Sequence, residues 1–317
     1  MVKKKNTITE SAWDEYKDTD SILAIGDLHY NENRIESIEE ATNSLFNNIK
    51  GKTFSKIVLL GDLFDKKPTT KERILLAQFL IKLRHHSNQI HFIIGNGKHT
   101  FEDECIYEQD WIELCGDFFQ HSELVLGKYV FTHSEFSGLR YINGKESEST
   151  RTVETDKIYI SGHIHSPSCS FKNVNYVGSL YKTSFDQIED KKRVCIIKNG
   201  NIKWIELMSK PMYQILLIGK EGKVKASGFK SLQESGDKDI DLKIRVETDS
   251  SSLASIHRII NKIKQDFKIE YYQQEIRINE IKVDVPDSLN QESLLKKYCN
   301  SKNVPYDLVL KELKQGV

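Results

Sequence analysis

Short apolar runs that end abruptly in glycine or a polar residue recur through the first half of the chain. These runs cover residues 22–25, 57–60, 90–94, 129–131 and 158–160. Runs of this length, rich in Ile, Val and aromatic residues, are typical of buried β-strands. Segments 35–49 and 70–83, which separate the first three runs, have apolar residues at helical spacing. The alternation of strand and helix predicts an α/β layered fold.

The pattern changes after residue 165, where strands are expected to follow one another directly. Strands are predicted at 174–180, 194–198, 202–207, 213–218 and 242–246, a hairpin turn at 199–201, a linker at 208–212 and helices at 252–267 and within 292–314. The length of 317 residues corresponds to about two domains. We therefore divide the chain into an N-terminal arm (1–20), a large α/β domain (21–210), a small α+β domain (211–287) and a helical tail (288–317).

Polar residues follow directly on the ends of the first five predicted strands. They are Asp27, His29, Asp62, Asn96, His133, His163 and His165. In open α/β sheets the ligand crevice lies beyond the carboxyl ends of the strands. All seven side chains are therefore expected to converge on one crevice.

The chemistry of this set indicates a metal centre. Two Asp, one Asn and four His offer oxygen and nitrogen ligands without a thiolate, which suits manganese, iron or zinc better than calcium. Seven ligands exceed the needs of one catalytic ion and fit two ions about 3.5–4 Å apart that share a bridging carboxylate. We assign the bridge to Asp62. The assignment gives Asp27, His29 and His165 to one ion and Asn96, His133 and His163 to the other. Such a pair can activate water for attack on phosphorus and stabilise the developing charge.

Five motifs carry a resemblance to a known family. They are Gly26-Asp-Leu-His29, Gly61-Asp-Leu-Phe-Asp65, Gly95-Asn96, Thr132-His133 and Gly162-His-Ile-His165. Together they resemble the signature of the calcineurin-like metallophosphoesterases. The resemblance implies a four-layer α/β/β/α sandwich with a dimetal centre, here over residues 21–210.

Two further motifs resemble one group within that family. They are His133-Ser-Glu-Phe-Ser-Gly138 and Tyr176-Val-Gly-Ser-Leu180 followed by Thr183-Ser-Phe185. Both are similar to the SbcD or Mre-eleven type of DNA repair nuclease subunit, and most of all to phage recombination nuclease subunits. This resemblance implies Mn²⁺ as the metal, a capping and DNA-binding role for residues 211–287, and a tail at 288–317 that docks on an SbcC-like coiled-coil ATPase. It also implies DNA ends, single strands or hairpins as substrates, and a homodimer as the oligomeric state to test.

The third motif departs from the family pattern. The family usually has a histidine directly after the Asn, which contacts the scissile phosphate and helps protonate the leaving group, whereas this chain has Gly97. Three interpretations remain open: His99 replaces that histidine as the general acid, Lys98 supplies positive charge, or the site turns over slowly. Loss of a general acid typically reduces the rate about 10²–10⁴-fold. Asp65 either hydrogen-bonds a metal-binding histidine or caps the following turn.

Charge and cysteine usage narrow the class of protein further. Lys and Arg total 46, as do Asp and Glu, so a globally basic nucleic-acid binder is excluded, although a local basic patch is not. The five cysteines are scattered without a CxxC pair, which argues against a disulfide framework. Neither a secretory signal nor a membrane-length apolar segment is evident. We expect a soluble, cytoplasmic protein that does not bind a membrane, located in the host cytoplasm if the chain is phage-encoded.

Three functional hypotheses follow. The first is a two-metal-dependent DNA exonuclease or endonuclease subunit that acts in end processing, recombination and repair with an SbcC-like ATPase. The second is a small-molecule phosphodiesterase or phosphatase of the same fold, which would not need the extension after residue 212. The third is a catalytically weakened DNA-binding subunit, supported by Gly97.

Overall fold

The computed structural model of the protein describes residues 12–14, 21–96 and 118–278, together with 295–296, 299–300 and 305–307. A six-stranded sheet in the order β11-β10-β2-β3-β4-β5 lies at its centre. Its strands are β2 (Ser21–Ile25), β3 (Lys56–Leu59), β4 (Ile90–Ile93), β5 (Phe118–His121), β10 (Arg193–Lys198) and β11 (Asn201–Glu206). Strands β2 to β5 are parallel to one another, so their carboxyl ends share one edge of the sheet.

A second sheet of five strands has the order β1-β6-β7-β8-β9. Its strands are β1 (Ala12–Asp14), β6 (Leu124–Leu126), β7 (Tyr129–Thr132), β8 (Ile158–Ser161) and β9 (Val174–Tyr176). Strands β7, β8 and β9 are parallel. Strand β1 pairs in parallel with β6, although sequence analysis placed residues 1–20 in an arm. Three residues are too few to give a readable alternation pattern.

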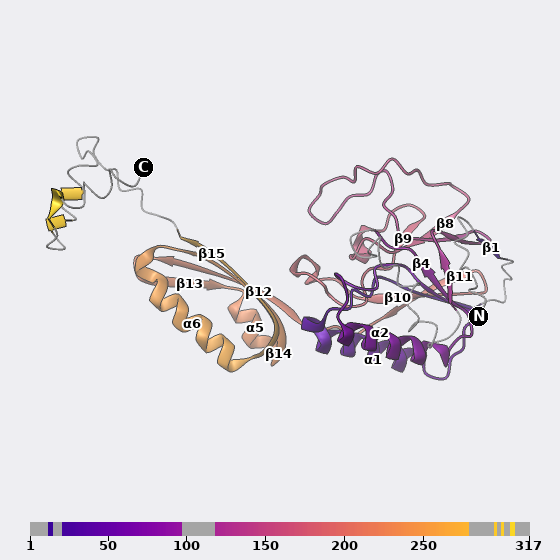
Figure 1. Ribbon diagram of the computed structural model, residues 1–317, viewed down its shortest axis with the longest axis horizontal. Helices are drawn as coiled ribbons and strands as arrows, with labels where there is room; N and C mark the ends of the chain where they lie inside the picture. The colour runs from indigo at the N-terminus through magenta and orange to yellow at the C-terminus, as the bar shows by residue number, and fades with distance from the viewer. Residues whose placement is uncertain are drawn as a thin grey trace.

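The two sheets pack face to face around an apolar core. Alternate residues of β2 and β3, such as Ala24 and Val58, share this core with Phe131 of β7 and Ile160 of β8. The opposite face of the six-stranded sheet is covered by helices α1 (Ile35–Ile49) and α2 (Thr70–Arg84), which lie side by side in Figure 1. The α/β layered fold expected from the sequence is thereby confirmed.

The local sequence explains where helix α2 begins and which side of helix α1 is buried. Helix α2 starts with a capping box, in which Thr69 and Glu72 each bond the other's backbone N–H. Helix α1 buries Ile38, Ala41 and Leu45, a spacing of three to four residues that forms one apolar stripe. This stripe fixes α1 against the sheet and so fixes the loop between β2 and α1.

The outer face of the five-stranded sheet is covered differently. Val130 and Tyr159 of this face pack against Phe136 and Leu139, which belong to an irregular segment after β7. Among the described residues no helix covers this face, so the fourth layer of the expected sandwich stays a prediction. Across all the residues that the structure describes, no helix combines the length and apolar character required to cross a membrane.

A third sheet forms a separate body, seen beside the first two in Figure 1. Its order is β13-β12-β14-β15, and the strands are β12 (Met212–Lys220), β13 (Lys223–Ser227), β14 (Asp239–Thr248) and β15 (Lys268–Ile278). Helices α5 (Phe229–Ser235) and α6 (Leu253–Asp266) bury one face of this sheet. The predicted domain boundaries and roles stay predictions, and most of the tail at 288–317 lies outside the described residues.

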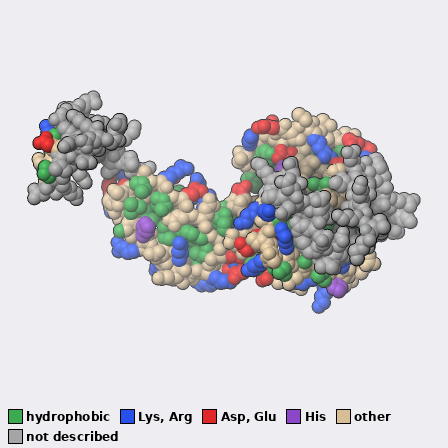
Figure 2. Space-filling model, in the orientation of Figure 1, with side chains coloured by type: hydrophobic (Ala, Val, Ile, Leu, Met, Phe, Trp, Pro, Cys, Tyr) green, Lys and Arg blue, Asp and Glu red, His purple; other side chains and the backbone are tan. Residues whose placement is uncertain are grey.

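Buried ion pairs join the third sheet to the rest. The guanidinium of Arg34, just before α1, lies 2.5 Å from the carboxylate of Asp241 on β14, and both side chains are almost fully buried. The carboxylate of Glu270 on β15 accepts the backbone N–H groups of Glu36 and Ser37, which caps the N-terminus of α1. Figure 2 shows acidic and basic side chains gathered at this junction.

We predict that Asp241→Ala destabilises the protein by about 3–5 kcal/mol, because Arg34 then remains buried without its counter-ion. Equilibrium urea unfolding measures the difference. The matched control is Glu234→Ala, which removes an exposed pair with Lys230 on α5 and is expected to cost less than about 0.5 kcal/mol. Equal effects of the two substitutions would contradict the prediction.

Candidate metal centre

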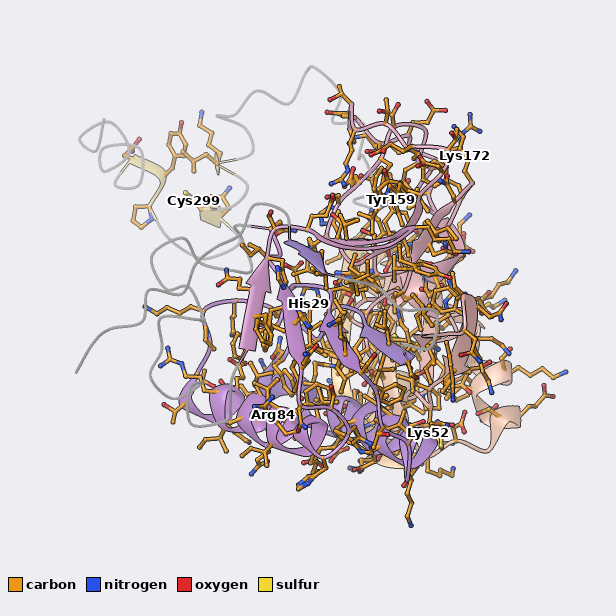
Figure 3. All side chains as sticks on the ribbon, turned by 90° about the vertical axis from the view of Figure 1, so that its right-hand side faces the viewer. His29, Lys52, Arg84, Tyr159, Lys172 and Cys299 are labelled. Atoms are coloured by element: carbon orange, nitrogen blue, oxygen red, sulfur yellow. The ribbon has the colours of Figure 1, made fainter. Side chains whose placement is uncertain are left out.

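The seven polar residues that follow the predicted strands lie together at the strand ends. Strands β2, β3 and β4 of the six-stranded sheet precede Asp27, His29, Asp62 and Asn96, and strands β7 and β8 of the five-stranded sheet precede His133, His163 and His165. Both sheets therefore contribute to one site. In Figure 3, His29 lies between the helical layer, marked by Arg84 and Lys52, and Tyr159 of the five-stranded sheet.

Three of these residues have strained backbones. His29, Asp62 and His163 adopt φ values of 42°, 40° and 73°, in the left-handed region that residues other than glycine rarely enter. The backbone N–H groups of Leu28 and His29 both donate to the carbonyl of Asp62, which holds the two loops against each other. Such strain persists only where the surrounding structure holds the backbone in place, and it is common at functional sites.

The glycines before the ligand residues are required by space. A Cβ atom on Gly95 would lie 2.1 Å from Oδ1 of Asp62, and a Cβ atom on Gly162 would lie 2.4 Å from Oδ1 of Asp27. Both distances are far inside van der Waals contact. The Gly-Asn and Gly-His motifs therefore exist because the backbone passes directly beside the carboxylates.

One group of donor atoms is formed by Asp27, His29, Asp62 and His165, whose ligand atoms all lie within 4.8 Å of one another. Nε2 of His165 lies 2.8 Å from Nε2 of His29 and 3.7 Å from Oδ2 of Asp27. Nε2 of His29 lies 3.8 Å from Oδ2 of Asp62. The four groups thus surround a common point.

A second group contains Asp62, His133 and His163. The same Oδ2 atom of Asp62 that faces His29 lies 3.2 Å from Nε2 of His133. Asn96 is beside this group, since its amide nitrogen lies 3.1 Å from Nδ1 of His163. Asp62 is therefore positioned between the two groups, where a bridging carboxylate would be.

Three of the histidines have a partner for the nitrogen that faces away from the donor groups. Nδ1 of His133 lies 2.7 Å from the carbonyl of Leu60, Nδ1 of His165 lies 3.1 Å from the hydroxyl of Thr183, and Nε2 of His163 lies 2.8 Å from the carboxylate of Glu135. Such bonds fix which nitrogen offers its lone pair to a metal. These roles were not predicted from the sequence. The one signal for Glu135 in the sequence is that it is an acidic residue two positions after the predicted ligand His133.

The electrostatics of the site favour cations. The side chains of Asp27 and Asp62 are at most 1 % exposed, and burial raises the pKa of Asp27. Burial alone would lower the pKa of His133, but Asp27 and Asp62 outweigh it and raise that pKa to about 9. Burial and the neighbouring His29 lower the pKa of His165, which keeps this imidazole neutral. Oδ2 of Asp27 is buried and makes no hydrogen bond within the described residues. The donor set therefore fits two divalent ions.

The remaining predicted site residues are at the edge of this arrangement. Oδ1 of Asp65 lies 3.6 Å from Nδ1 of His29, and its side chain is 46 % exposed and accepts a hydrogen bond from Asn31. This placement favours contact with a metal-binding histidine over direct catalysis. His99, predicted as general acid, lies outside the described residues, as do Gly97 and Lys98.

An α/β fold with an Asp and His donor set at the strand ends, able to hold two ions, is suited to metal-dependent hydrolysis of phosphoesters. Residues 21–172 match the family described as calcineurin-like phosphoesterases, so this part of the chain is a calcineurin-like metallophosphoesterase domain. The chain is also similar to a protein named "Putative phosphoesterase 244L" of Invertebrate iridescent virus 6. The two are 23 % identical over 224 residues, which cover 57 % of this chain and 77 % of the viral protein.

We predict that Gly162→Ala reduces divalent metal affinity by at least about 10-fold, because the new methyl group displaces Asp27 and disturbed support of a metal ligand typically costs about 10–100-fold in affinity. Calorimetric titration with Mn²⁺ measures the loss. Gly144→Ala is the control, because its Cβ atom meets nothing within 4 Å, although Gly144, unlike Gly162, has a positive φ. Native metal affinity in Gly162→Ala would overturn the interpretation.

Metal affinity is also expected to depend on pH. With its pKa raised to about 9 in the metal-free protein, His133 carries a proton at neutral pH that must leave before the imidazole can bind an ion. Affinity should therefore rise about tenfold per pH unit as pH increases towards 9 and level off above it. Calorimetry in two buffers of different ionisation enthalpy counts the released proton. An affinity that is constant between pH 7 and 9 would contradict this assignment.

Proposed function

We propose that the protein is a two-metal-dependent DNA nuclease subunit, an exonuclease or endonuclease that hydrolyses phosphodiester bonds during DNA end processing, recombination and repair. The observation that carries the proposal is a basic sheet face whose junction end is linked to the surroundings of the metal centre. A phosphatase of small molecules has no need of such a face, whereas a polymeric substrate extends beyond the reacting phosphate.

The basic face is the side of the third sheet opposite α5 and α6. Because strand side chains alternate between faces, Ile215 and Leu217 point to the helices, and their neighbours point away. On that outward side the charged residues beyond the junction are Lys220, Lys223, Lys225, Lys243, Arg245 and Arg277, against Glu247 and Glu275. Six basic and two acidic residues form a local positive surface within a chain of zero net charge, as phosphate contacts require.

The face adjoins the metal centre through a short set of contacts. Tyr271, on the same face of β15, stacks on Phe185 with ring centroids 5.4 Å apart. Phe185 opens η4 (Phe185–Gln187), two residues after Thr183, which contacts Nδ1 of His165. A strand of nucleic acid could therefore contact the basic face and the centre together.

The residues of the centre have distinct tasks in phosphodiester hydrolysis. Divalent ions supply an acidified water and neutralise charge on the phosphate when they are bound. Asp62 would hold both ions, Asp27, His29 and His165 would hold one of them, and Asn96, His133 and His163 would hold the other. Leu60, Thr183 and Glu135 fix the orientation of three imidazoles. We assign the leaving-group proton to His99, with Lys98 as the alternative source of positive charge.

Several finer points of the proposal rest on the sequence motifs. We propose Mn²⁺ as the native metal, an SbcC-like coiled-coil ATPase as the partner of residues 288–317, and double-stranded ends, single strands or hairpins as substrates. A homodimer and a cytoplasmic location belong to the same proposal. Gly97 is the observation that favours the second candidate, a DNA-binding subunit with weakened catalysis.

The purified chain is expected to cleave an end-labelled linear DNA duplex in the presence of Mn²⁺. His163→Ala should lose this cleavage, because it removes a donor from the second group. DNA that is bound but not cut by either protein would favour the weakened subunit. Hydrolysis of a small phosphodiester such as bis(p-nitrophenyl) phosphate without DNA cleavage or binding would favour the small-molecule enzyme.

The basic face has its own test, which is DNA affinity as a function of salt. Lys223→Gln with Lys225→Gln should weaken binding and reduce the slope of log affinity against log salt by about 0.9 for each lost phosphate contact. The matched control is Arg258→Gln with Lys262→Gln, which removes two exposed charges from α6 on the opposite side. Equal losses in the two double variants would contradict a specific role for this face.

A further inference from the structure

We propose that Lys192 is a positioning residue for the metal centre, which orients His165 through a buried hydrogen-bond network. This inference rests on the metal centre and on phosphoester hydrolysis there, and it does not depend on DNA as the substrate. The observation behind it is that the hydrogen-bond partners of this buried lysine are His165, a predicted metal ligand, and residues that hold the loop and ring of His165.

Lys192 immediately precedes β10, and its side chain is fully buried. A buried ammonium group is costly unless each of its protons is bonded. Nζ of Lys192 donates to the carbonyl of His165 at 3.0 Å, to the hydroxyl of Ser179 at 3.0 Å and to the side-chain carbonyl of Gln187 at 2.6 Å. Asp190 lies 3.6 Å away and balances part of the charge. The three donor protons of the ammonium are thereby all used.

The network reaches the imidazole of His165 by a second route. Nε2 of Gln187 donates to the hydroxyl of Thr183 at 3.0 Å, and that hydroxyl lies 3.1 Å from Nδ1 of His165. Lys192 therefore fixes the carbonyl of His165 directly, and it fixes the ring through Gln187 and Thr183. The backbone N–H of Ser179 donates to the same carbonyl, which adds a further restraint on the loop.

The consequence is a defined direction for one nitrogen. With Nδ1–H donating to Thr183, Nε2 of His165 has a lone pair that faces His29 and Asp27. Loss of such a supporting bond typically lowers metal affinity by about 10–100-fold, because the ring can then rotate or change its tautomer. The basic run at 191–193 is typical of a solvated loop or of a contact with a DNA backbone, and neither the burial of Lys192 nor its partners can be read from it.

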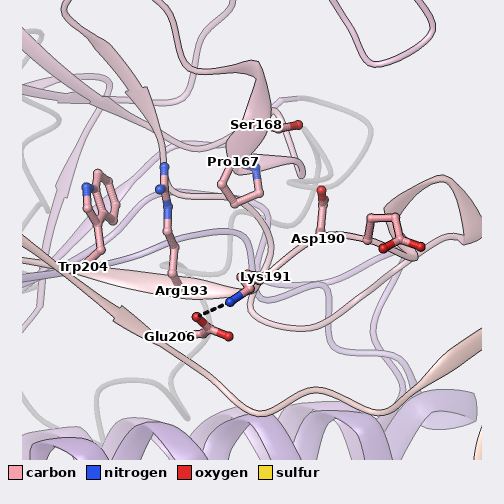
Figure 4. A pocket seen from close by; sticks show the side chains of 8 residues that line it. Pro167, Ser168, Asp190, Lys191, Arg193, Trp204 and Glu206 are labelled. Carbon is pink, nitrogen blue, oxygen red and sulfur yellow. Dashed lines mark hydrogen bonds and ion pairs between the residues drawn. The ribbon is translucent and has the colours of Figure 1, made fainter. Parts of the chain in front are cut away.

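The neighbouring lysine provides a matched control. Lys191 is 78 % exposed and pairs with Glu206 at 3.2 Å. Lys191, Arg193 and Trp204 line a pocket of about 380 Å³, and Figure 4 draws their side chains. Lys191 and Lys192 thus carry the same charge one residue apart, but only Lys192 contacts the loop of His165.

The test is calorimetric titration with Mn²⁺ of the full chain and of its variants. Lys192→Met should weaken one of the two binding steps by about 10–100-fold and leave the other unchanged. His165→Ala identifies that step, because it removes the ligand itself. Lys191→Met should bind both ions as the native protein does. Circular dichroism and urea unfolding establish that each variant is folded.

A second variant keeps the test valid if Lys192→Met does not fold. Thr183→Val removes one hydroxyl at nearly constant volume and should weaken the same step, whereas Thr183→Ser should restore it. A role in folding alone would not produce this rescue. Native affinity in folded Lys192→Met, or in Thr183→Val, would overturn the proposal. Absence of Mn²⁺ binding by the native chain would overturn it together with the metal centre, whereas failure to cleave DNA with both ions bound would contradict only the nuclease function.

Discussion

Two buried carboxylates, Asp27 and Asp62, impose the constraint on which the rest of the site depends. Both side chains are almost fully buried. Burial raises the pKa of Asp27, and the negative charge of Asp62 raises it further. Isolated buried charges are very costly, so a stable fold must surround them with donors and cations. Oδ1 of Asp62 accepts the backbone N–H of Asn96, and Oδ1 of Asp27 accepts that of His163. The carboxylates therefore tie four strand ends, those of β2, β3, β4 and β8, and both sheets together.

The local features of the motifs follow from that constraint. The loops must come close enough to donate N–H groups to the carboxylates, so Gly95 and Gly162 are the residues that fit beside them. The positive φ values of Asp62 and His163 turn the chain sharply at the strand ends, where both side chains join the donor groups. The apolar core between the sheets, including Ala24 and Val58, supplies the rigidity that keeps this strain in place.

The sequence predicted the parts of the site that repeat a local rule. Asp62 and His163 could be predicted because each follows a short apolar run and a glycine, and parallel strands bring such positions to one edge. The helices at 35–49 and 70–84 were predicted within one residue because their apolar spacing is regular. Glu135 and Thr183 could not be assigned in this way, because they lie in irregular segments whose contacts depend on the whole fold.

The same reasoning explains why the third sheet could be predicted only in part. Strand β14 and helix α6 have clear periodicity, whereas β13 is short and largely exposed, and β15 has no regular alternation of burial. The cap that Glu270 places on α1 joins residues more than 230 positions apart, and no local pattern indicates it.

That junction gives the appended sheet a defined relation to the metal centre. Arg34 joins the third sheet to a loop beside the centre. It pairs with Asp241 on β14 and donates to the carbonyl of Lys182, next to Thr183. The ring of Tyr181 lies 5.4 Å from the same guanidinium, and its hydroxyl donates to the carbonyl of His29. A displacement of β14 would therefore disturb the surroundings of both His29 and His165. Because the buried pair at Asp241 resists such a displacement, the orientation of the basic face and the geometry of the centre are set by one connected group of side chains.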